Sequence, residues 1–275
     1  MENLKHLADI ASPLAVMAGK EIMAVRAGGF AVDTKSDGSP VTVADQRAER
    51  IILQGLQSAH ITIPVIAEEQ MSNGIVPDIS GGTFLCIDPL DGTKEFARGG
   101  EDFTVNIALV QGRQPVFGII YIPATRVLYV GYQSNADRAE PNPTAYRVSI
   151  GNDGTQGLRQ PISCRPARSP PAIVASRSHM NEDTQRFLKK YPDSQTVNVG
   201  SSLKFCRVAE GTADLYPRFS PTMEWDTAAG DAILRAAGGM TFGHDGHPFR
   251  YHKPGFRNRH FMATGTATAD PNLWI

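Results

Sequence analysis

A short apolar run that ends in two aspartates constrains this 275-residue chain more than any other feature. Residues 84–87 are apolar; Asp88 and Asp91 follow them, and a glycine and Thr93 come next. The run predicts a buried strand that ends in a tight turn. Two carboxylates and a hydroxyl at one sheet edge would suit a Mg²⁺ ion beside a phosphate. Taken alone, the same residues are equally consistent with an ordinary turn.

Two further apolar segments also end in acidic residues. Residues 61–67 run into Glu68 and Glu69. Asp226 begins a stretch of small and apolar residues at helical spacing, which a Gly-Gly pair closes, and this pattern predicts a buried helix. Singly, the two glutamates are consistent with a solvated loop and Asp226 with a helix cap. Three apolar segments that each end in acid favour a shared cation site.

Composition is typical of a two-domain enzyme with substantial cores, since 41% of the residues are hydrophobic. A net charge of −1 predicts no general attraction to nucleic acid or to an anionic membrane. No apolar run approaches the roughly 20 residues that span a bilayer, and the N-terminus lacks the layout of a signal peptide. Cys86, Cys164 and Cys206 are widely spread, which indicates reduced thiols in a cytoplasmic protein. Peripheral attachment to the inner membrane stays open.

The periodicity of the chain predicts two parts, residues 1–160 and 161–275, joined by a proline- and arginine-rich passage. In the first part, helices over residues 4–25 and about 41–57 would cover an antiparallel sheet. Its strands are expected at residues 61–67, 83–87, 103–110, 115–122, 126–132 and 145–150. In the second part, strands and helices alternate, which favours a layered α/β arrangement. Its strands are expected at residues 172–176, 196–199, 214–218, 240–242 and 261–264, and its helices near 182–191 and 201–209 and from residue 225.

Two motifs carry a resemblance to the inositol monophosphatase superfamily of Mg²⁺-dependent, lithium-sensitive phosphomonoesterases. They are residues 87–93 with Phe96, and residues 225–230 continuing to Gly239, and the resemblance covers essentially the whole chain. It implies an α+β fold, the layered α/β/α/β/α sandwich of the inositol monophosphatase and fructose-1,6-bisphosphatase type. One departure is Ala67, where a glycine is common in the family.

Within the superfamily, the chain is most similar to the bacterial 3'(2'),5'-bisphosphate nucleotidases of sulfur assimilation. The similarity lies in residues 93–96 continuing to 103–109, in residues 176–179 and in residues 200–206. It implies hydrolysis of adenosine 3',5'-bisphosphate to AMP and phosphate, with 3'-phosphoadenylyl sulfate as a further candidate substrate. The implied partner is a small-molecule nucleotide, and a homodimer is a further candidate assembly.

The resemblance also implies a cofactor, two or three Mg²⁺ ions per site. The first ion is assigned to Glu68, Asp88 and the backbone carbonyl of Leu90. The second is assigned to Asp88, Asp91 and Asp226. Few protein ligands per ion are reasonable, because Mg²⁺ normally keeps several waters. Glu69 would support these ligands or a weak additional ion.

The predicted catalytic pair is Asp45 and Thr93. The Thr93 hydroxyl, paired with Asp45, would orient and deprotonate the attacking water, which is a general-base role. Gly92 and Thr93 would present backbone N–H groups to the phosphate. The alternative for Asp45 is an ordinary acid on a helix surface.

Specificity is expected from the second half, where Arg, Lys, His and Ser suit a spare phosphate, a ribose and a base. The substrate-binding candidates are Glu68, Leu90, Asp91, Gly92, Thr93, Ser176, His179, Ser201, Lys204, Arg218 and Asp226. For Lys204 and Arg218, a solvated surface position is an equally good interpretation. The other histidines show no metal-binding spacing and are expected to be structural.

Three other functions compete with this one. The EF-hand calcium-binding motif does not fit the sequence. Positions 3, 5 and 12 of its loop would be Leu90, Gly92 and Gly99, which have no side-chain oxygen ligand. A non-catalytic nucleotide sensor on the same fold is possible in principle, since fold does not determine function. The main alternative is another small-molecule phosphatase, acting on inositol monophosphate or a sugar bisphosphate.

Overall fold

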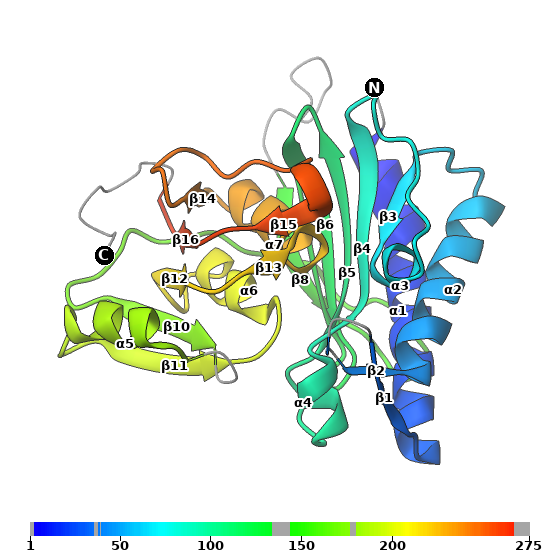
Figure 1. Ribbon diagram of the computed structural model, residues 1–275, viewed down its shortest axis with the longest axis horizontal. Coiled ribbons are helices and arrows are strands. Elements are labelled where there is room, and N and C mark those ends of the chain that lie inside the picture. Colours follow the sequence, from blue (N-terminus) through cyan, green and yellow to red (C-terminus); the bar gives the residue numbers. More distant parts are fainter. Residues whose placement is uncertain (1–2, 36–37, 39, 134–143, 177–179, 267–275) are drawn as a thin grey trace.

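Helical layers and two β-sheets alternate through the molecule (Figure 1). The computed structural model describes residues 3–35, 38, 40–133, 144–176 and 180–266. In order, the layers are helices α1 and α2, a seven-stranded sheet, helices α6 and α7, a five-stranded sheet and helix α5. This is the predicted layered α+β sandwich.

The first sheet has the strand order β3-β4-β5-β6-β7-β8-β9. Its strands are β3 (Val65–Ala67), β4 (Thr83–Asp91), β5 (Thr104–Gln111), β6 (Gln114–Ile122), β7 (Val127–Tyr132), β8 (Thr144–Ser149) and β9 (Gln160–Pro161). The sheet is antiparallel from β4 to β9, as predicted, but β3 and β4 pair in parallel. Parallel pairing requires a crossover connection. Here residues 68–82, which include α3 (Glu68–Ser72), carry the chain back before β4 begins.

Helices α1 (Leu4–Gly28) and α2 (Val43–Ser58) cover one face of this sheet. Helix α1 buries Leu7, Leu14 and Ile22 on one side, as the helical spacing of its apolar residues predicts. Asn3 caps the helix by accepting a hydrogen bond from the backbone N–H of His6 at 3.1 Å. Both helices therefore pack an apolar face against the sheet. Their bounds are close to the predicted ones.

Helices α6 (Leu203–Ala209) and α7 (Glu224–Ala236) lie on the other face of the sheet. Helix α7 approaches β6 and β7 closely, because glycines stand at the points of contact. A Cβ atom on Gly118 would lie 2.3 Å from the carbonyl oxygen of Ala229, and one on Gly131 would lie 2.5 Å from the Cα of Ile233. The small residues of α7 and these glycines together place the helix directly on the strand backbones.

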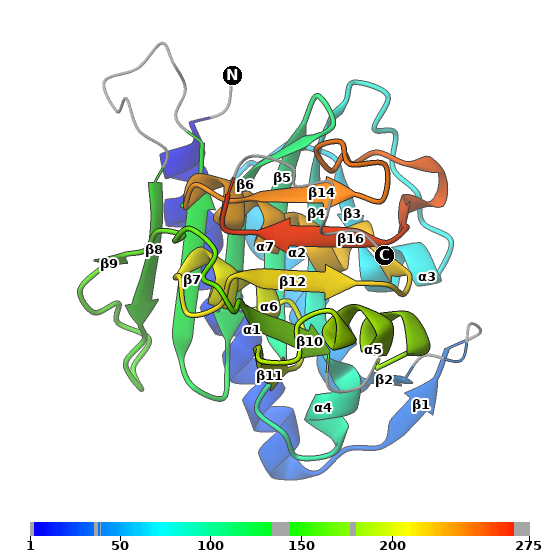
Figure 2. The same ribbon diagram turned by 90° about the vertical axis from the view of Figure 1, so that its left-hand side faces the viewer.

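The second sheet has the order β11-β10-β12-β16-β14, seen face-on in Figure 2. Its strands are β10 (Ala172–Ser176), β11 (Gln195–Val199), β12 (Leu215–Arg218), β14 (Met240–Gly243) and β16 (Phe261–Thr264). Helix α5 (Glu182–Lys189) covers its outer face and inserts Phe187 against Ile173, Leu215 and Met262.

Several short elements were not predicted from the sequence. They are β1 (Val32–Thr34), β2 (Pro40–Thr42), α4 (Thr93–Ala97), β13 (Thr222–Met223), η1 (Pro254–Phe256) and β15 (Arg257–Asn258). They are too short to show periodicity. Strands β1 and β2 form a local antiparallel pair, whereas β13 and β15 pair across more than 30 positions of the sequence.

The two predicted parts share a buried apolar core around α7. Phe84 and Cys86 from the first part pack in one cluster with Phe205 and Phe261 from the second. The division near residue 160 stays a prediction. Among the described residues, no helix combines the length and the apolar character that a membrane span requires.

Candidate active site

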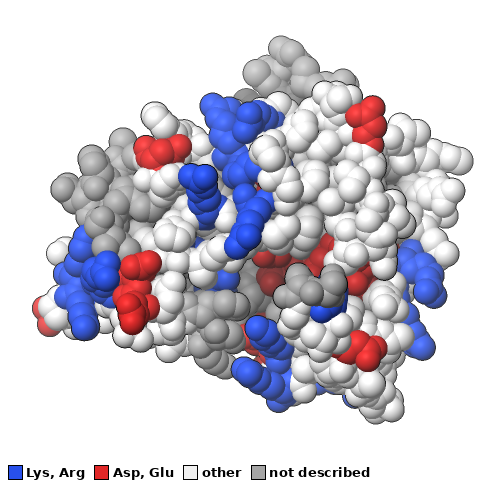
Figure 3. Space-filling view, viewed as in Figure 1, with Lys and Arg blue, Asp and Glu red and all other residues white. Residues whose placement is uncertain are grey.

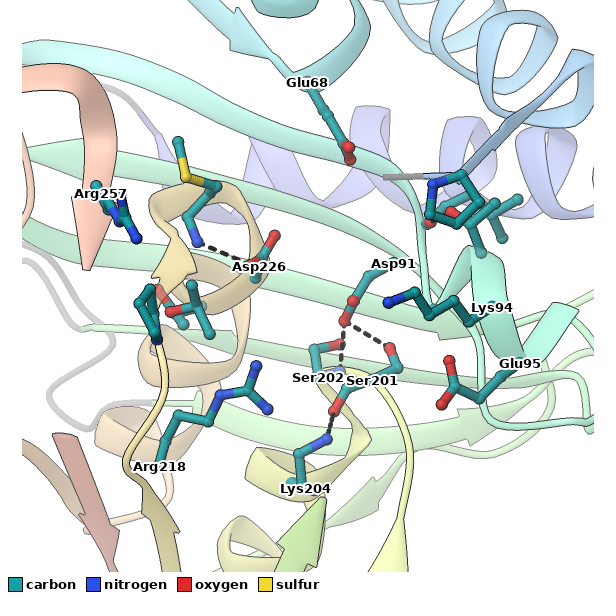
Figure 4. Close-up of a pocket in the computed structure, with 18 of the residues that line it drawn as sticks. Glu68, Asp91, Lys94, Glu95, Ser201, Ser202, Lys204, Arg218, Asp226 and Arg257 are labelled. Atoms are coloured by element: carbon teal, nitrogen blue, oxygen red, sulfur yellow. Dashed lines mark hydrogen bonds between the residues drawn. The ribbon is translucent and has the colours of Figure 1, made fainter. Parts of the chain in front are cut away.

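A cavity of about 650 Å³ opens between the two sheets, at the end of β4. Glu68 from the start of α3, Asp91 from the end of β4 and Asp226 from the first turn of α7 line it (Figure 4). The three acid-ended segments recognised in the sequence therefore meet at one place. Lys204 and Arg218 line the opposite part of the same cavity.

A β-bulge in β4 shapes the aspartate pair. Asp88 pairs with Asn106 and Asp91 with Thr104, so three steps on β4 match two on β5. In a regular strand, side chains three apart point to opposite faces of the sheet. The extra residue removes that alternation, which lets both carboxylates approach the same site. The backbone N–H of Leu90 donates to Oδ1 of Asp88 at 3.0 Å and stabilises the bulge.

Gly92 makes the turn from β4 into α4 possible. Its φ of 93° is in the left-handed region, and a Cβ atom there would lie 2.8 Å from the carbonyl oxygen of Asp102. The turn places Thr93 at the first position of α4, beside the carbonyl oxygen of Leu90. Leu90, Gly92 and Thr93 all line the cavity.

A hydroxyl network that the sequence did not reveal holds Asp91. Its Oδ2 accepts hydrogen bonds from Oγ of Ser201 at 2.6 Å and from the backbone N–H of Ser202 at 2.5 Å. Oγ1 of Thr104 lies 2.7 Å from Oγ of Ser201 and donates to Oδ1 of Asn106 at 2.9 Å. The hydroxyl of Ser201, a predicted substrate contact, is thus engaged with Asp91 and Thr104. No sequence signal connects these residues, which are about a hundred positions apart.

Asp226 is fixed by the start of α7. Its Oδ2 accepts a hydrogen bond from the backbone N–H of Met223 at 2.8 Å, so the same carboxylate that faces the cavity also caps the helix. The capping interpretation and the cation-site interpretation are therefore compatible for this residue.

Lys35 lies between the paired glutamates. Its Nζ is 2.7 Å from Oε1 of Glu68 and 2.6 Å from Oε1 of Glu69. Burial acts to lower the pKa of Lys35, but the two carboxylates outweigh it and raise the pKa above its usual value. Glu49 in turn accepts the backbone N–H of Glu69 at 2.8 Å, and burial raises the pKa of Glu49 to about 7. Lys35 was not among the predicted site residues.

Within the described structure, the negative charges of Asp88 and Asp226 are not balanced by nearby positive groups. Burial, followed by repulsion from Glu68, Asp91 and Asp226, raises the pKa of Asp88 well above its usual value. Burial and then repulsion from Asp91 and Glu68 do the same to the pKa of Asp226.

Among the described residues, no three His, Cys, Asp or Glu side chains converge closely enough to hold an ion in this conformation. The chemistry of the donor set nevertheless fits Mg²⁺, because all the donors are hard oxygens whose mutual repulsion a divalent cation would relieve. The assignment of Glu68, Asp88, Leu90, Asp91 and Asp226 as metal ligands stays a prediction.

Asp45 and Thr93 are brought into direct contact. Oγ1 of Thr93 lies 3.0 Å from Oδ1 of Asp45, and Oδ2 of Asp45 accepts the backbone N–H of Thr42 at 2.7 Å as part of a helix cap. Asp45 is only 2% exposed, so it is not the surface acid of the alternative interpretation. Burial raises its pKa. A raised pKa makes a carboxylate a better proton acceptor.

Lys204 and Arg218 are buried rather than solvated. Nζ of Lys204 donates to the carbonyl oxygens of Ser201 at 2.5 Å and Val199 at 3.3 Å. Burial lowers the pKa of Lys204 to about 8. Arg218 is 8% exposed, and among the described residues its Nε has no hydrogen-bond partner. A buried guanidinium group with an unpaired N–H in a cavity wall is suited to bind an anion.

The remaining specificity candidates are only partly described. Ser176 ends β10, but its side chain is outside the described structure, and His179 lies outside the described residues altogether. Conversely, Lys94, Tyr216 and Arg257 line the cavity without having been predicted. Lys94 directly follows Thr93, whereas strand pairing between distant segments positions Tyr216 and Arg257.

Comparison with known proteins agrees with this geometry. A model of the inositol monophosphatase family matches residues 3–270. The 3'(2'),5'-bisphosphate nucleotidase CysQ of Escherichia coli (strain K12) is 40% identical over 252 residues, which cover 89% of this chain and 96% of that protein. The corresponding nucleotidase of Haemophilus influenzae is 28% identical over 97% of this chain and 95% of its own.

Solved structures show the same fold. The crystal structure of CysQ from Bacteroides thetaiotaomicron, described as a bacterial member of the inositol monophosphatase family, has a TM-score of 0.77 and 35% identity, covering 95% of this chain and 98% of that one. An inositol monophosphatase from Anabaena has a TM-score of 0.71 at 23% identity, covering 97% of this chain and 93% of that one, and shows likeness of fold alone. The chain therefore belongs to the inositol monophosphatase family of metal-dependent phosphatases and is an enzyme of that class.

Proposed function

We propose that the enzyme uses Mg²⁺ to hydrolyse the 3'-phosphate of adenosine 3',5'-bisphosphate, leaving AMP. The observation that carries the proposal is the division of one cavity into two charged parts. Asp91 and Asp226 line one part, and Lys204 and Arg218 lie together beside it (Figure 4). A ligand with two separate phosphates matches this division, and the curated relatives at about 40% identity are named as bisphosphate nucleotidases.

The acidic part would bind the cations and the scissile phosphate. Glu68, Asp88, Asp91 and Asp226 would hold Mg²⁺, which supplies a lowered pKa for bound water and neutralises the phosphoryl oxygens. Ser201, Ser202 and Met223 keep Asp91 and Asp226 oriented through the hydrogen bonds described above. These hydrogen bonds restrict the orientation of both carboxylates before a cation arrives.

Asp45 and Thr93 would accept the proton of the attacking water. With the Thr93 hydroxyl donating to Oδ1 of Asp45, the lone pairs of Oγ1 are free to accept a hydrogen bond from a water. As that water attacks the phosphorus, its proton passes to Oγ1 and the hydroxyl proton passes to Asp45. The P–O3' bond breaks in the same displacement, and the departing 3'-oxygen takes a proton from solvent water. The raised pKa of Asp45 favours this uptake, which is general-base catalysis through a hydroxyl relay.

The basic part would bind the second phosphate. Arg218 has a free donor at Nε, and Lys204 adds a neighbouring positive charge. A charge-assisted hydrogen bond contributes about 1.5–3 kcal/mol, so each contact corresponds to roughly a 10- to 100-fold change in affinity. The same contacts would accept the phosphosulfate group of 3'-phosphoadenylyl sulfate. Inositol 1-phosphate offers only one anionic group and would leave Arg218 without a partner.

Phosphate release from four substrates tests the proposal. The compounds are adenosine 3',5'-bisphosphate, 3'-phosphoadenylyl sulfate, inositol 1-phosphate and fructose 1,6-bisphosphate, each with saturating Mg²⁺. We expect the highest kcat/KM for the two nucleotides. Arg218→Gln should raise KM for adenosine 3',5'-bisphosphate roughly 10- to 100-fold with a much smaller effect on kcat.

The matched control is Arg186→Gln, which removes the same charge from an exposed position on α5. It should leave both constants within about twofold of wild type, as is usual for exposed sites. Faster hydrolysis of inositol 1-phosphate than of the nucleotide by wild type would refute the substrate assignment.

A further inference from the structure

A second cavity, of about 750 Å³, lies outside the acidic site and is lined by positive charge. Most of its wall comes from the segment after β14, residues 243–260. Five cationic side chains line it: Arg113, Arg250, Lys253, Arg257 and Arg259. Asp245 is the single carboxylate residue in the lining, and three histidines add further nitrogen atoms. A cavity of this size is in the range of small-molecule sites, about 300–1,000 Å³.

Buried acids of helix α7 brace this basic segment. Oε2 of Glu224 accepts the backbone N–H of His252 at 2.8 Å, and Oε1 accepts Nζ of Lys253 at 3.0 Å. Arg235, paired with Asp231 at 2.9 Å, donates to the carbonyl oxygen of Phe249 at 2.7 Å. The wall of the cavity is thus attached to the same helix that carries Asp226.

Unusual backbone conformations gather around the cavity. Arg113, His252 and Phe256 have φ values of 67°, 63° and 55°, a region that residues other than glycine rarely adopt. Arg113 is held in this conformation from both sides, since its Nε donates to the carbonyl oxygen of Tyr251 at 3.2 Å and its own carbonyl accepts the Tyr251 N–H at 3.1 Å. For Arg113 the positive φ belongs to the two-residue turn between β5 and β6, and its contacts with Tyr251 join that turn to the basic segment.

Most of the positive charge is not neutralised by the protein. Within the described part of the chain, no carboxylate lies within salt-bridge distance of Arg113, Arg250, Arg257 or Arg259. Figure 3 shows Lys and Arg side chains gathered beside the hollow that contains the red acidic group. Arg257 lines both cavities, so the two are adjacent.

We propose that this basic cavity is a second binding site, for a compact anion that carries two or more charges on phosphate or sulfate groups. Planar guanidinium groups match the oxygen atoms of such anions with paired hydrogen bonds. The concave shape and limited volume favour a small molecule over an extended polymer. The whole chain has a net charge of −1, so the attraction is local to this cavity.

Titration with inorganic pyrophosphate and inorganic sulfate in magnesium-free buffer tests this site separately from catalysis. Without a divalent cation the carboxylates of the acidic cavity repel anions, and amide shifts at residues 204 and 218 would reveal any binding to the cations in its wall. We expect one saturable site by calorimetry. Backbone amide shifts in NMR spectra should be confined to residues 243–260 and Arg113, and absent from residues 88–93.

The test variant is the double substitution Arg250→Ser and Arg259→Ser, which leaves the acidic cavity untouched. It should weaken pyrophosphate binding at least tenfold. The matched control, Arg50→Ser with Lys189→Ser, removes two exposed charges from α2 and α5 and should stay within twofold of wild type.

Three outcomes would overturn the proposal: no binding by the wild type, an equal loss in the control, or shifts at residues 88–93 instead. A fourth is retention by phosphatidylglycerol vesicles or duplex DNA without affinity for either small anion. That result would assign the surface to a macromolecule.

Discussion

Burial determines the chemistry of single charged residues in this enzyme. Asp88 and Asp226 are pushed towards their protonated forms by desolvation and by each other, and burial lowers the pKa of Lys204 to about 8. Exposed acids and lysines of the same chain lack this environment. The charged groups of the cavity therefore favour the binding of ions of opposite charge. In the absence of such ions, their burial and mutual repulsion destabilise the fold.

Substitution of Asp226 by Asn tests this balance between function and stability. The amide oxygen can still accept the Met223 N–H, so the start of α7 is preserved. With one carboxylate fewer, kcat at saturating Mg²⁺ should fall at least 100-fold. In chelator, the midpoint of thermal unfolding should stay level or rise, because repulsion is relieved. Phosphate release and calorimetry measure the two effects.

The matched control is Asp78→Asn, at an exposed position, which should change neither quantity. Normal turnover by Asp226→Asn would argue against a ligand role for Asp226.

The burial of Lys204 predicts how the free energy of unfolding depends on pH. Its pKa is about 8 in the folded protein against an ordinary 10.5, so between these values the unfolded chain binds more protons. Stability contributed by this residue therefore rises as pH increases from 8 to 10.5. We expect the unfolding free energy of wild type minus that of Lys204→Met to increase over this window, by at most about 3 kcal/mol. Urea unfolding at several pH values measures it, and a flat difference would contradict the burial argument.

At the scale of elements, the close packing of helix α7 on the first sheet positions both cavities. The helix carries Asp226 at its first turn and braces the basic segment through Glu224 and Asp231. Its distance from β6 depends on Gly118, where a side chain would meet the helix backbone. A shift of the helix would therefore disturb the carboxylates and the basic segment together.

Gly118→Ala tests this packing. The new Cβ atom would lie 2.3 Å from the carbonyl oxygen of Ala229, so helix and strand must separate. Overpacking of this kind costs about 1–3 kcal/mol. We expect that loss in chemical unfolding, together with a reduced kcat/KM, because Asp226 moves away from Asp91. Gly81→Ala is the control, since no atom lies within 4 Å of its Cβ position. Equal stability of the two variants would show that the contact is easily relieved.

At the scale of the whole molecule, metal binding should be coupled to proton release and to stability. The raised pKa values of Asp88 and Asp226 mean that the folded apo enzyme binds more protons than the unfolded chain at mildly acidic pH. The sign follows directly: apo stability falls as pH rises from the ordinary carboxyl range of about 4 towards the raised values. A cation removes this penalty.

We expect the unfolding midpoint in chelator to be lower at pH 8 than at pH 5.5, and Mg²⁺ to raise it more at pH 8. Calorimetric titration of Mg²⁺ in buffers of different ionisation enthalpy should show protons released on binding. Asp226→Asn should flatten both trends. Proton uptake on binding, or a midpoint gain independent of pH, would contradict the coupling.

The longer helices, most strands and the three acid-ended segments could be predicted because each is a local pattern. Helical spacing predicted α1, and apolar runs bounded by turn residues predicted β4 to β8. The motif around Asp88 also revealed the family. These features need only neighbours along the chain, so the sequence contains them directly.

Other properties arose only when distant segments packed together. Lys204 and Arg218 could equally have been solvated, and their burial depends on the second sheet closing over α6. The contact of Lys35 with Glu68 joins residues 33 positions apart. The hydrogen bond from Ser201 to Asp91 joins residues 110 positions apart. The basic cavity likewise needs Arg113 beside the segment after β14. Local patterning thus determined the elements and their acidic ends, whereas desolvation and long-range charge pairing, which depend on tertiary packing, decided how those groups behave.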